Sequence, residues 1–287
     1  MLNYDFMVNA FQASGIVAVL ASVVGYFLVL RGQTFAGHAL SHVGFAGATG
    51  AAMFAVSPFV GMTGFTVISA VGIGLLGDRA QGRDVAIGLV LSMSLGLGLL
   101  FLHFYTAYAG QATALLFGNV LGVSRSTVAT LAVMAVFALA ALAVVLRPLV
   151  FASLQPEVAE ARGVPLQAVS VVFLVIVAVA VSEATQIVGV LLVFALLVGP
   201  PAAAMLLTAR IGQGVALAAA LALLEAWGGL VLAYYTDWPA SFWITLLSVV
   251  VYGVARAARR LLPAAGRAPV AARSGEDDLP DGIRSDV

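Results

Sequence analysis

The feature that most limits the fold of this sequence is a series of nine apolar segments, each about 16 to 23 residues long. As helices that rise about 1.5 Å per residue, segments of this length cross a hydrocarbon core of roughly 30 Å. A helix also satisfies its own backbone hydrogen bonds where no water is present. We therefore predict an all-α, polytopic membrane helix bundle. Its predicted spans are 8–30, 34–56, 58–77, 85–104, 127–146, 166–182, 187–208, 213–235 and 240–255.

The charged residues predict how this bundle lies in the membrane. Hydrophobic residues make up 62% of the chain and charged residues only 9%, a composition typical of integral membrane proteins. Short cytoplasmic loops are enriched in basic residues. With the N-terminus outside and the C-terminus in the cytoplasm, Arg125 is the only one of the 13 basic residues on the outer side. An odd number of crossings, nine, fits this distribution, whereas a short sixth span or an interfacial first segment would leave eight.

Residue types that the chain lacks exclude several functions. There is no cysteine, so disulfides, thiolate nucleophiles and zinc–thiolate sites are absent. All basic residues are arginine and the formal net charge is zero, which argues against a nucleic-acid partner. Without lysine the chain cannot contain a Gly-x-x-x-x-Gly-Lys-Ser/Thr loop for nucleotide phosphates. Any ATP-driven step therefore requires a separate protein.

Two of the three histidines lie four residues apart in the stretch "AGHALSHVGFAG". At this spacing His38 and His42 share one face of a helix and can bind one cation. A membrane zinc protease would need His-Glu-x-x-His, but Ala39 stands at the glutamate position. Packing inside the bundle is the alternative. We favour metal binding, because ionisable residues within membranes usually mark transport pathways.

Other polar or helix-breaking residues are candidates for a pathway through the membrane. Glu225 is predicted near the middle of the eighth span, where it could relay or bind a cation or hydrogen-bond to a neighbouring helix. Gly199 and Pro200, followed by Pro201, interrupt the backbone hydrogen bonds of the seventh span and predict either exposed carbonyls or a simple kink. Glu183 is predicted at the outer boundary as a solvated side chain.

Three segments outside the predicted spans have compositions that predict other structures. Residues 105–126 predict a short or re-entrant helix on the outer side. Residues 155–165, "QPEVAEARGVP", begin with Pro156 and Glu157 and end with Gly163 and Pro165, which predicts a cytoplasmic helix of one to two turns. The chain therefore divides into a transmembrane domain, 1–257, and a cytoplasmic tail, 258–287, whose composition predicts disorder.

Taken together, four stretches resemble the membrane permeases of bacterial ABC importers for zinc, manganese and iron(II). In order they are "LRGQTFAGHALSHVGFAG"; "RDVAIGLVLSMSLGLGLLFL" with "LLFGNVLGVSRS"; "PEVAEARGVP"; and "QIVGVLLVFALLVGPPAAAMLLT" followed by "AYYTDWPASFWITLL".

The resemblance implies a homodimeric permease in the bacterial plasma membrane that is not itself an enzyme. It implies two copies of a cytoplasmic ATPase and an extracytoplasmic metal-binding protein as partners, and no permanently bound cofactor. The short helix then resembles the coupling helix that docks on the ATPase. The residues of this predicted contact are Glu157, Glu160, Ala161 and Gly163.

One departure from the family pattern concerns the transported ion. The family usually has aspartate four residues before the histidine, where this chain has His38. Imidazole suits zinc and carboxylate suits manganese, so we predict zinc as cargo before manganese. A stand-alone carrier that uses Glu225 for proton coupling is the alternative function, and a membrane enzyme using the two histidines is disfavoured because no general base or nucleophile lies near them in the sequence.

Overall fold

The computed structural model describes residues 4–77, 82–104, 110, 116 and 118–261. All regular elements in these ranges are helical, which confirms the predicted all-α class. In chain order the elements are α1 (Asp5–Leu30), α2 (Thr34–Met53), α3 (Pro58–Leu75), α4 (Arg83–Phe104), the 3-10 turn η2 (Val120–Gly122), α6 (Arg125–Leu154), α7 (Pro156–Ala161), α8 (Leu166–Val188), α9 (Val190–Leu207), α10 (Ile211–Thr236) and α11 (Ala240–Leu261).

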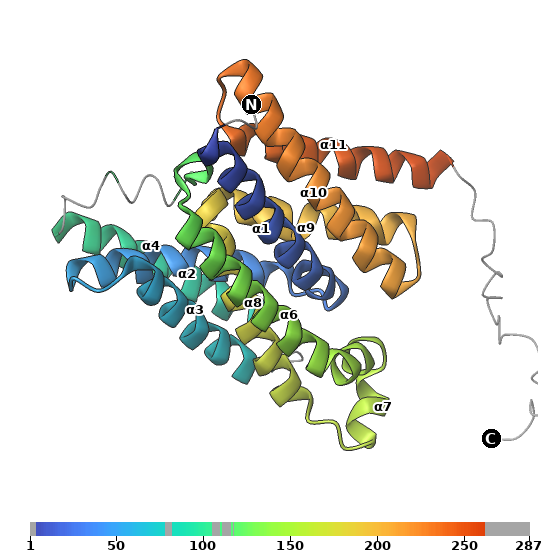
Figure 1. Cartoon of the computed structure of the whole chain (residues 1–287). Helices are drawn as coiled ribbons and strands as arrows, with labels where there is room; N and C mark the ends of the chain where they lie inside the picture. The colour runs from blue at the N-terminus through green and yellow to red at the C-terminus, as the bar shows by residue number, and fades with distance from the viewer. Residues whose placement is uncertain (1–3, 78–81, 105–109, 111–115, 117, 262–287) are drawn as a thin grey trace, which may run out of the picture.

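Three helices form the centre of the bundle (Figure 1). α1, α8 and α9 contact one another, α2 to α4 pack on one side of them, and α10 and α11 pack on the other. In the most apolar 18-residue window of α1 and of α8, 72% of the residues are buried, against 17% in α4 and α11. α4 and α11 therefore lie at the periphery.

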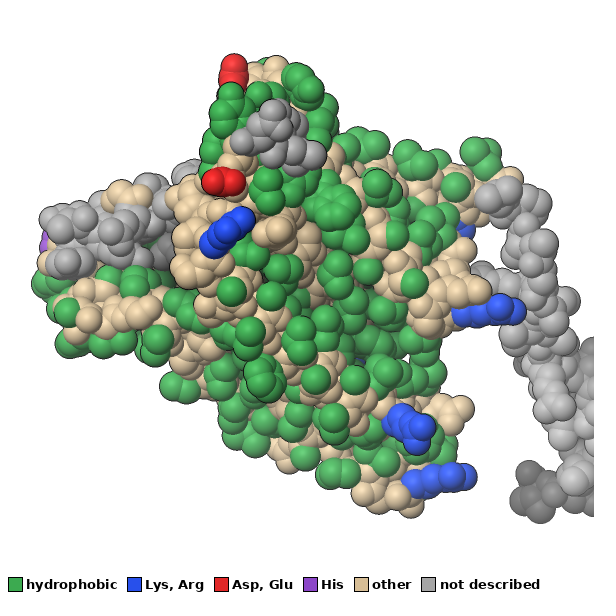
Figure 2. Space-filling view, in the orientation of Figure 1, with side chains coloured by type: hydrophobic (Ala, Val, Ile, Leu, Met, Phe, Trp, Pro, Cys, Tyr) green, Lys and Arg blue, Asp and Glu red, His purple; other side chains and the backbone are tan. Residues whose placement is uncertain are grey.

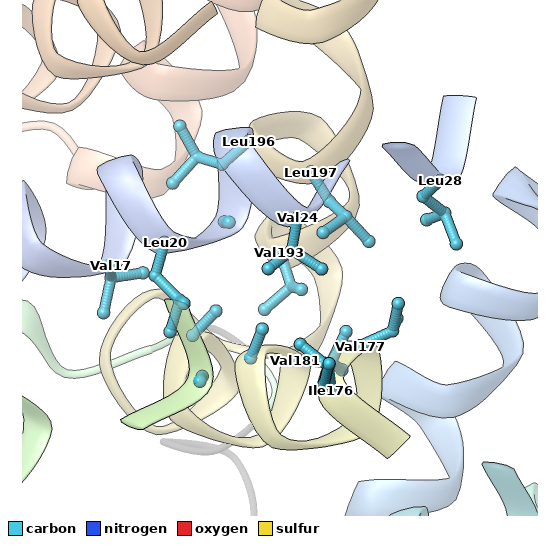
Figure 3. Packing of buried hydrophobic residues seen from close by; sticks show 14 of the residues in the cluster. Val17, Leu20, Val24, Leu28, Ile176, Val177, Val181, Val193, Leu196 and Leu197 are labelled. Atoms are coloured by element: carbon cyan, nitrogen blue, oxygen red, sulfur yellow. The ribbon is translucent and has the colours of Figure 1, made fainter. Parts of the chain in front are cut away.

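Branched aliphatic side chains form much of the core between the central helices (Figure 3). Val17, Leu20 and Val24 of α1 meet Val177 and Val181 of α8 and Val193, Leu196 and Leu197 of α9, and all are buried. Lipid tails are as apolar as these side chains, so close packing rather than transfer out of water holds such helices together. Gly25 permits the closest approach, because a Cβ atom there would collide with the carbonyl of Leu197.

The helices are long and apolar enough to make the chain a multi-pass membrane protein. Among the described residues, seven helices meet the requirements for spanning: α1, α3, α4, α6, α8, α10 and α11. α2 is 20 residues long but carries both histidines and several glycines, and α9 counts only as a shorter apolar helix over Leu192–Leu207. Hydrophobic side chains cover most of the face in Figure 2, and charged ones gather toward its ends. The predicted eight or nine crossings require one or both of α2 and α9 to cross as well.

The predicted end of the sixth span, residue 182, and the solvated position of Glu183 were wrong. α8 continues to Val188 and stops at Gly189, whose φ of 83° ends the helix. Glu183 is 0% exposed. The polar run around it suggested a boundary, but one neighbour, Ser182, is satisfied inside the bundle, where it shares a hydrogen bond of 2.8 Å with Thr66 of α3.

Two other predicted segments lie partly outside the described residues. The short or re-entrant helix predicted over residues 105–126 falls mainly on residues that are not described; the described part of this segment includes the single turn η2 and the start of α6. At the C-terminus, α11 continues to Leu261, so the first four residues of the predicted tail are helical. Arg259 and Arg260 in its last turn stabilise that helix end through the helix dipole. Residues 262–287 lie outside the described residues.

Candidate functional site

His38 and His42 lie on the same face of α2, as their spacing predicted. Their ring centroids are 4.8 Å apart and the ring planes are inclined by 81°. Two nitrogens that bind one tetrahedral zinc ion lie about 3.3 Å apart. Ring centroids 4.8 Å apart are compatible with ring nitrogens at that distance, so the geometry permits the pair to chelate one ion.

The surroundings of the pair leave polar atoms without partners. The Nδ1 atoms of both rings are buried, and neither has a hydrogen-bond partner among the described residues. Phe194 of α9 packs edge-on against His38, with ring centroids 5.0 Å apart. An apolar ring cannot satisfy an imidazole nitrogen, and an unsatisfied buried polar atom costs roughly 1–3 kcal/mol. A cation or a group from another chain would remove this cost.

The histidine face of α2 is incomplete in a single chain. Both rings and Phe194 are half-buried, while the rest of α2 between Ala36 and Gly50 is buried. Within the described ranges no group of three or more His, Cys, Asp or Glu residues is placed to hold a metal ion. At this position the described part of one chain offers two imidazoles, so any ion bound here would need further ligands from water, backbone or another molecule.

Glu225 lies within α10 and is 1% exposed. Neither of its carboxylate oxygens has a partner with hydrogen-bond geometry among the described residues, although Ser248 of α11 is its polar neighbour. The Ser248 hydroxyl donates to the carbonyl of Ala195 in α9 over 3.3 Å. A Cβ atom at Gly199 would collide with the same hydroxyl. Glu225 therefore belongs to a polar contact among α9, α10 and α11.

The prolines of α9 do not break that helix, which is continuous from Val190 to Leu207. They lack the N–H groups that would bond the carbonyls of Leu196 and Leu197. The Leu197 carbonyl lies against Gly25 of α1, so one of the two freed carbonyls is covered by helix packing.

The predicted short helix is present as α7, Pro156–Ala161. It begins with proline at its first turn, and Gly163, with a φ of 80°, follows its end. Ala159 is buried, whereas Glu157, Glu160, Ala161 and Gly163 are exposed. The four residues of the predicted coupling contact thus lie on an accessible surface at the turn between α6 and α8.

Sequence reasoning missed Phe194 and the burial of Glu183. Phe194 stands in an apolar run where nothing distinguishes it from a core residue. Its contact with His38 joins helices far apart in the chain, so no local pattern predicts it.

A model of the ABC 3 transport family matches residues 3–259. The chain belongs to the ABC 3 transport family. This confirms the resemblance found in the sequence. It also confirms the prediction that the chain is a membrane transport subunit and not an enzyme.

Named relatives match over almost the whole chain. The manganese transport system membrane protein MntC of Halalkalibacterium halodurans is 30% identical over 89% of this chain and 88% of its own length. A probable metal transport system membrane protein of Treponema pallidum is 32% identical over 88% of this chain and 94% of its own length. A probable iron transport system membrane protein of Haemophilus influenzae is 27% identical over 89% of this chain and 94% of its own length.

Two solved structures share the fold. PsaBC from Streptococcus pneumoniae in complex with Fab matches with a TM-score of 0.79 and 24% identity, over 88% of this chain and 91% of that one. An inward-facing conformation of a putative metal-chelate type ABC transporter matches with a TM-score of 0.70 and 16% identity, over 87% of this chain and 85% of that one. At these identities the likeness supports the arrangement of helices alone.

Proposed function

We propose that this chain is the permease subunit of an ATP-driven importer for a divalent transition metal, with zinc favoured over manganese. The observation that carries the proposal is the pair His38 and His42, two imidazoles at chelating distance inside a membrane transport subunit. Relatives named as manganese, metal and iron transport proteins support a metal cargo. The alternative of a stand-alone proton-coupled carrier is not favoured, because the family is one of ABC transport.

The half-buried histidine face favours a homodimer. Polar side chains exposed to lipid are costly, so a partner surface should cover this face. A second copy would add two further imidazoles near the same pathway. Closed four-ligand sites are typical of structural zinc, which is held permanently. We infer that the passing ion is held by fewer protein ligands at a time, with water completing its shell, because it must be released again.

The energy source lies on another chain. This sequence has no nucleotide-phosphate loop, so ATP hydrolysis requires a separate cytoplasmic ATPase. We assign the contact with it to the exposed residues Glu157, Glu160, Ala161 and Gly163. An extracytoplasmic metal-binding protein would deliver the ion at the opposite end. With α7 in the cytoplasm of a bacterial cell, α1 starts outside and α11 ends inside, as the arginines favour.

Glu225, Gly199 and Pro200 are the proposed elements of the pathway beyond the histidines. Glu225 is a buried carboxylate within the membrane whose polar neighbour is Ser248, and such positions are usually functional. Gly199 allows α11 to approach α9 closely. Pro200 leaves the Leu196 carbonyl without its helical donor and so offers an oxygen ligand. Glu183 is a further buried polar group, to which we assign no role.

The proposal predicts that the purified chain neither binds nor hydrolyses ATP. Activity should appear only when the ATPase subunit is added, because this chain contributes no phosphate-binding residues. The measurement is phosphate release by the chain alone, by the ATPase alone and by the complex in lipid vesicles. Hydrolysis by the chain purified to homogeneity would contradict the importer function.

A second prediction concerns the ion. His38→Asp replaces an imidazole by the carboxylate usual in the family, and should retain transport while shifting preference from zinc toward manganese by roughly tenfold. Competitive uptake of the two ions into vesicles containing the whole complex measures the ratio. His103→Asp is the matched control, since His103 is exposed near the end of α4. An unchanged zinc-to-manganese ratio in His38→Asp would show that position 38 does not contact the ion.

A further inference from the structure

The connection that precedes the histidine helix is rigid and short. α1 ends at Leu30 and α2 starts at Thr34, with Arg31, Gly32 and Gln33 between them. The amides of Gly32 and Gln33 donate to the carbonyls of Val29 and Leu28, each over 3.0 Å, and Gly32 has a φ of 66°. This arrangement is a Schellman motif, which fixes the exit angle of the chain. Whatever holds Arg31 therefore also holds the start of α2.

The side chain of Arg31 contacts the two helices that flank α7. Its Nη1 atom donates to the hydroxyl of Ser153 near the end of α6, a long hydrogen bond of 3.5 Å. Its guanidinium carbon lies 5.7 Å from the ring centre of Phe173 in α8. That ring is fully buried, so its position is fixed by the core. Arg31 thus bridges α6 and α8 by a hydrogen bond and a cation–π contact.

The same side chain borders a cavity beside α7. The cavity, of about 690 Å³, is lined by Arg31, Ser153, Glu160 and Gln167 among others. Glu160 belongs to α7 itself, so the helix proposed to contact the ATPase and the Arg31 side chain face one space.

We propose that Arg31 is a positioning residue that transmits movement of α7 to the histidine helix α2. When the ATPase displaces α7, the ends of α6 and α8 move with it. The guanidinium, which is held by Ser153 and Phe173, carries the displacement through the rigid connection to Thr34, one turn before His38. The planar fork of arginine can donate to α6 while it stacks on α8, which the ammonium of lysine does poorly. The inference rests on the proposed function, because it presupposes an ATPase at α7.

The experiment uses the complete complex of permease, ATPase and delivery protein in lipid vesicles. Arg31→Met keeps much of the length of the side chain and removes its donors and charge. We expect stimulation of ATP hydrolysis by the metal-loaded delivery protein to fall roughly tenfold, because the variant loses both the long hydrogen bond to Ser153 and the cation–π contact with Phe173. The number of ions imported per ATP should fall with it, whereas basal hydrolysis, assembly and thermal stability stay near wild type. Arg31→Lys should recover part of the stimulation.

Arg147→Met is the matched control, because Arg147 is an exposed arginine of α6 in the same cytoplasmic region. It should behave as wild type. If the Arg31→Met permease does not assemble with the ATPase, the stimulation of ATP hydrolysis is measured in Ser153→Ala instead. This substitution removes the acceptor on α6, together with a hydrogen bond from Ser153 to the Leu149 carbonyl in the same helix, and we expect it to lower stimulation about threefold.

The possible results separate this inference from the proposed function. A wild-type complex without stimulation by the loaded delivery protein contradicts the proposed function and the inference together. A stimulated wild type with equal stimulation in Arg31→Met, or in Ser153→Ala where that variant decides, overturns the inference alone. Equal loss in Arg147→Met also overturns it, since the effect would then reflect positive charge at this end of the bundle and not the bridge.

Discussion

Replacing His42 by alanine should abolish metal transport while leaving the protein folded. The side chain is half-buried beside His38, and its Nδ1 atom has no partner among the described residues, so its removal breaks no hydrogen bond described for the fold. It does remove one of the two imidazoles that one chain offers the ion. Loss of a group that only hydrogen-bonds to a metal ligand lowers metal affinity or activity about 10- to 100-fold. Loss of a ligand itself should lower transport by more. Uptake of radioactive zinc into vesicles by the whole complex measures the effect.

His103→Ala is the control for this substitution, because it removes the third histidine from an exposed position on α4. Transport by His103→Ala should equal that of wild type. Size-exclusion chromatography and a thermal melt should show the same assembly in both variants. Zinc uptake by His42→Ala at the wild-type rate would mean that the pair only packs against Phe194 and that the ion takes another route.

Replacing Ala161 by arginine should uncouple ATP hydrolysis from transport. Ala161 is exposed at the end of α7, beside the buried Ala159 that seats this helix against the bundle. A bulky charged side chain there fits into solvent but not into the groove of a docked ATPase, since an unpaired charge buried in an interface is costly. We expect transport to fall to background, with membrane insertion intact, measured as ions imported per ATP hydrolysed.

Gly212→Arg provides the comparison, because it adds the same charge at an exposed position near the start of α10, with open space around its Cα. This variant should transport normally. If Ala161→Arg assembles with the ATPase and remains coupled, the two proteins meet at another surface.

The sequence was informative about the helices because membrane spans obey strong local rules. Segment length and the absence of charge located the long helices, and Pro156 and Gly163 marked both ends of α7. The rule failed at Glu183, where polar residues wrongly indicated a boundary. Ser182 finds its partner in Thr66 on another helix, a contact that no window of the sequence contains. Helix ends inside a bundle are therefore set by packing as well as by composition.

The sequence predicted only the part of the candidate site that lies on a single helix, α2. The spacing of His38 and His42 on a 3.6-residue helix fixes a shared face, and the structure places the rings together. The aromatic ring beside them comes from α9, far away in the sequence, and the contacts of Arg31 likewise come from α6 and α8. Such contacts depend on how helices pack, which periodicity does not encode. The sequence likewise left open whether the prolines of α9 expose backbone carbonyls. One of the two freed carbonyls is covered by Gly25 of α1, a contact between helices that the sequence pattern does not contain.

X-ray absorption at the zinc edge tests whether the imidazoles of His38 and His42 bind the passing ion. The complex would be loaded with zinc and arrested with an ATPase that binds but does not hydrolyse ATP. We predict at least two imidazole nitrogens at about 2.0 to 2.1 Å from the zinc. The imidazole signal should decrease in His42→Ala and stay unchanged in His103→Ala. A shell of oxygen atoms only, or the same spectrum from wild type and His42→Ala, would show that these imidazoles do not bind the ion.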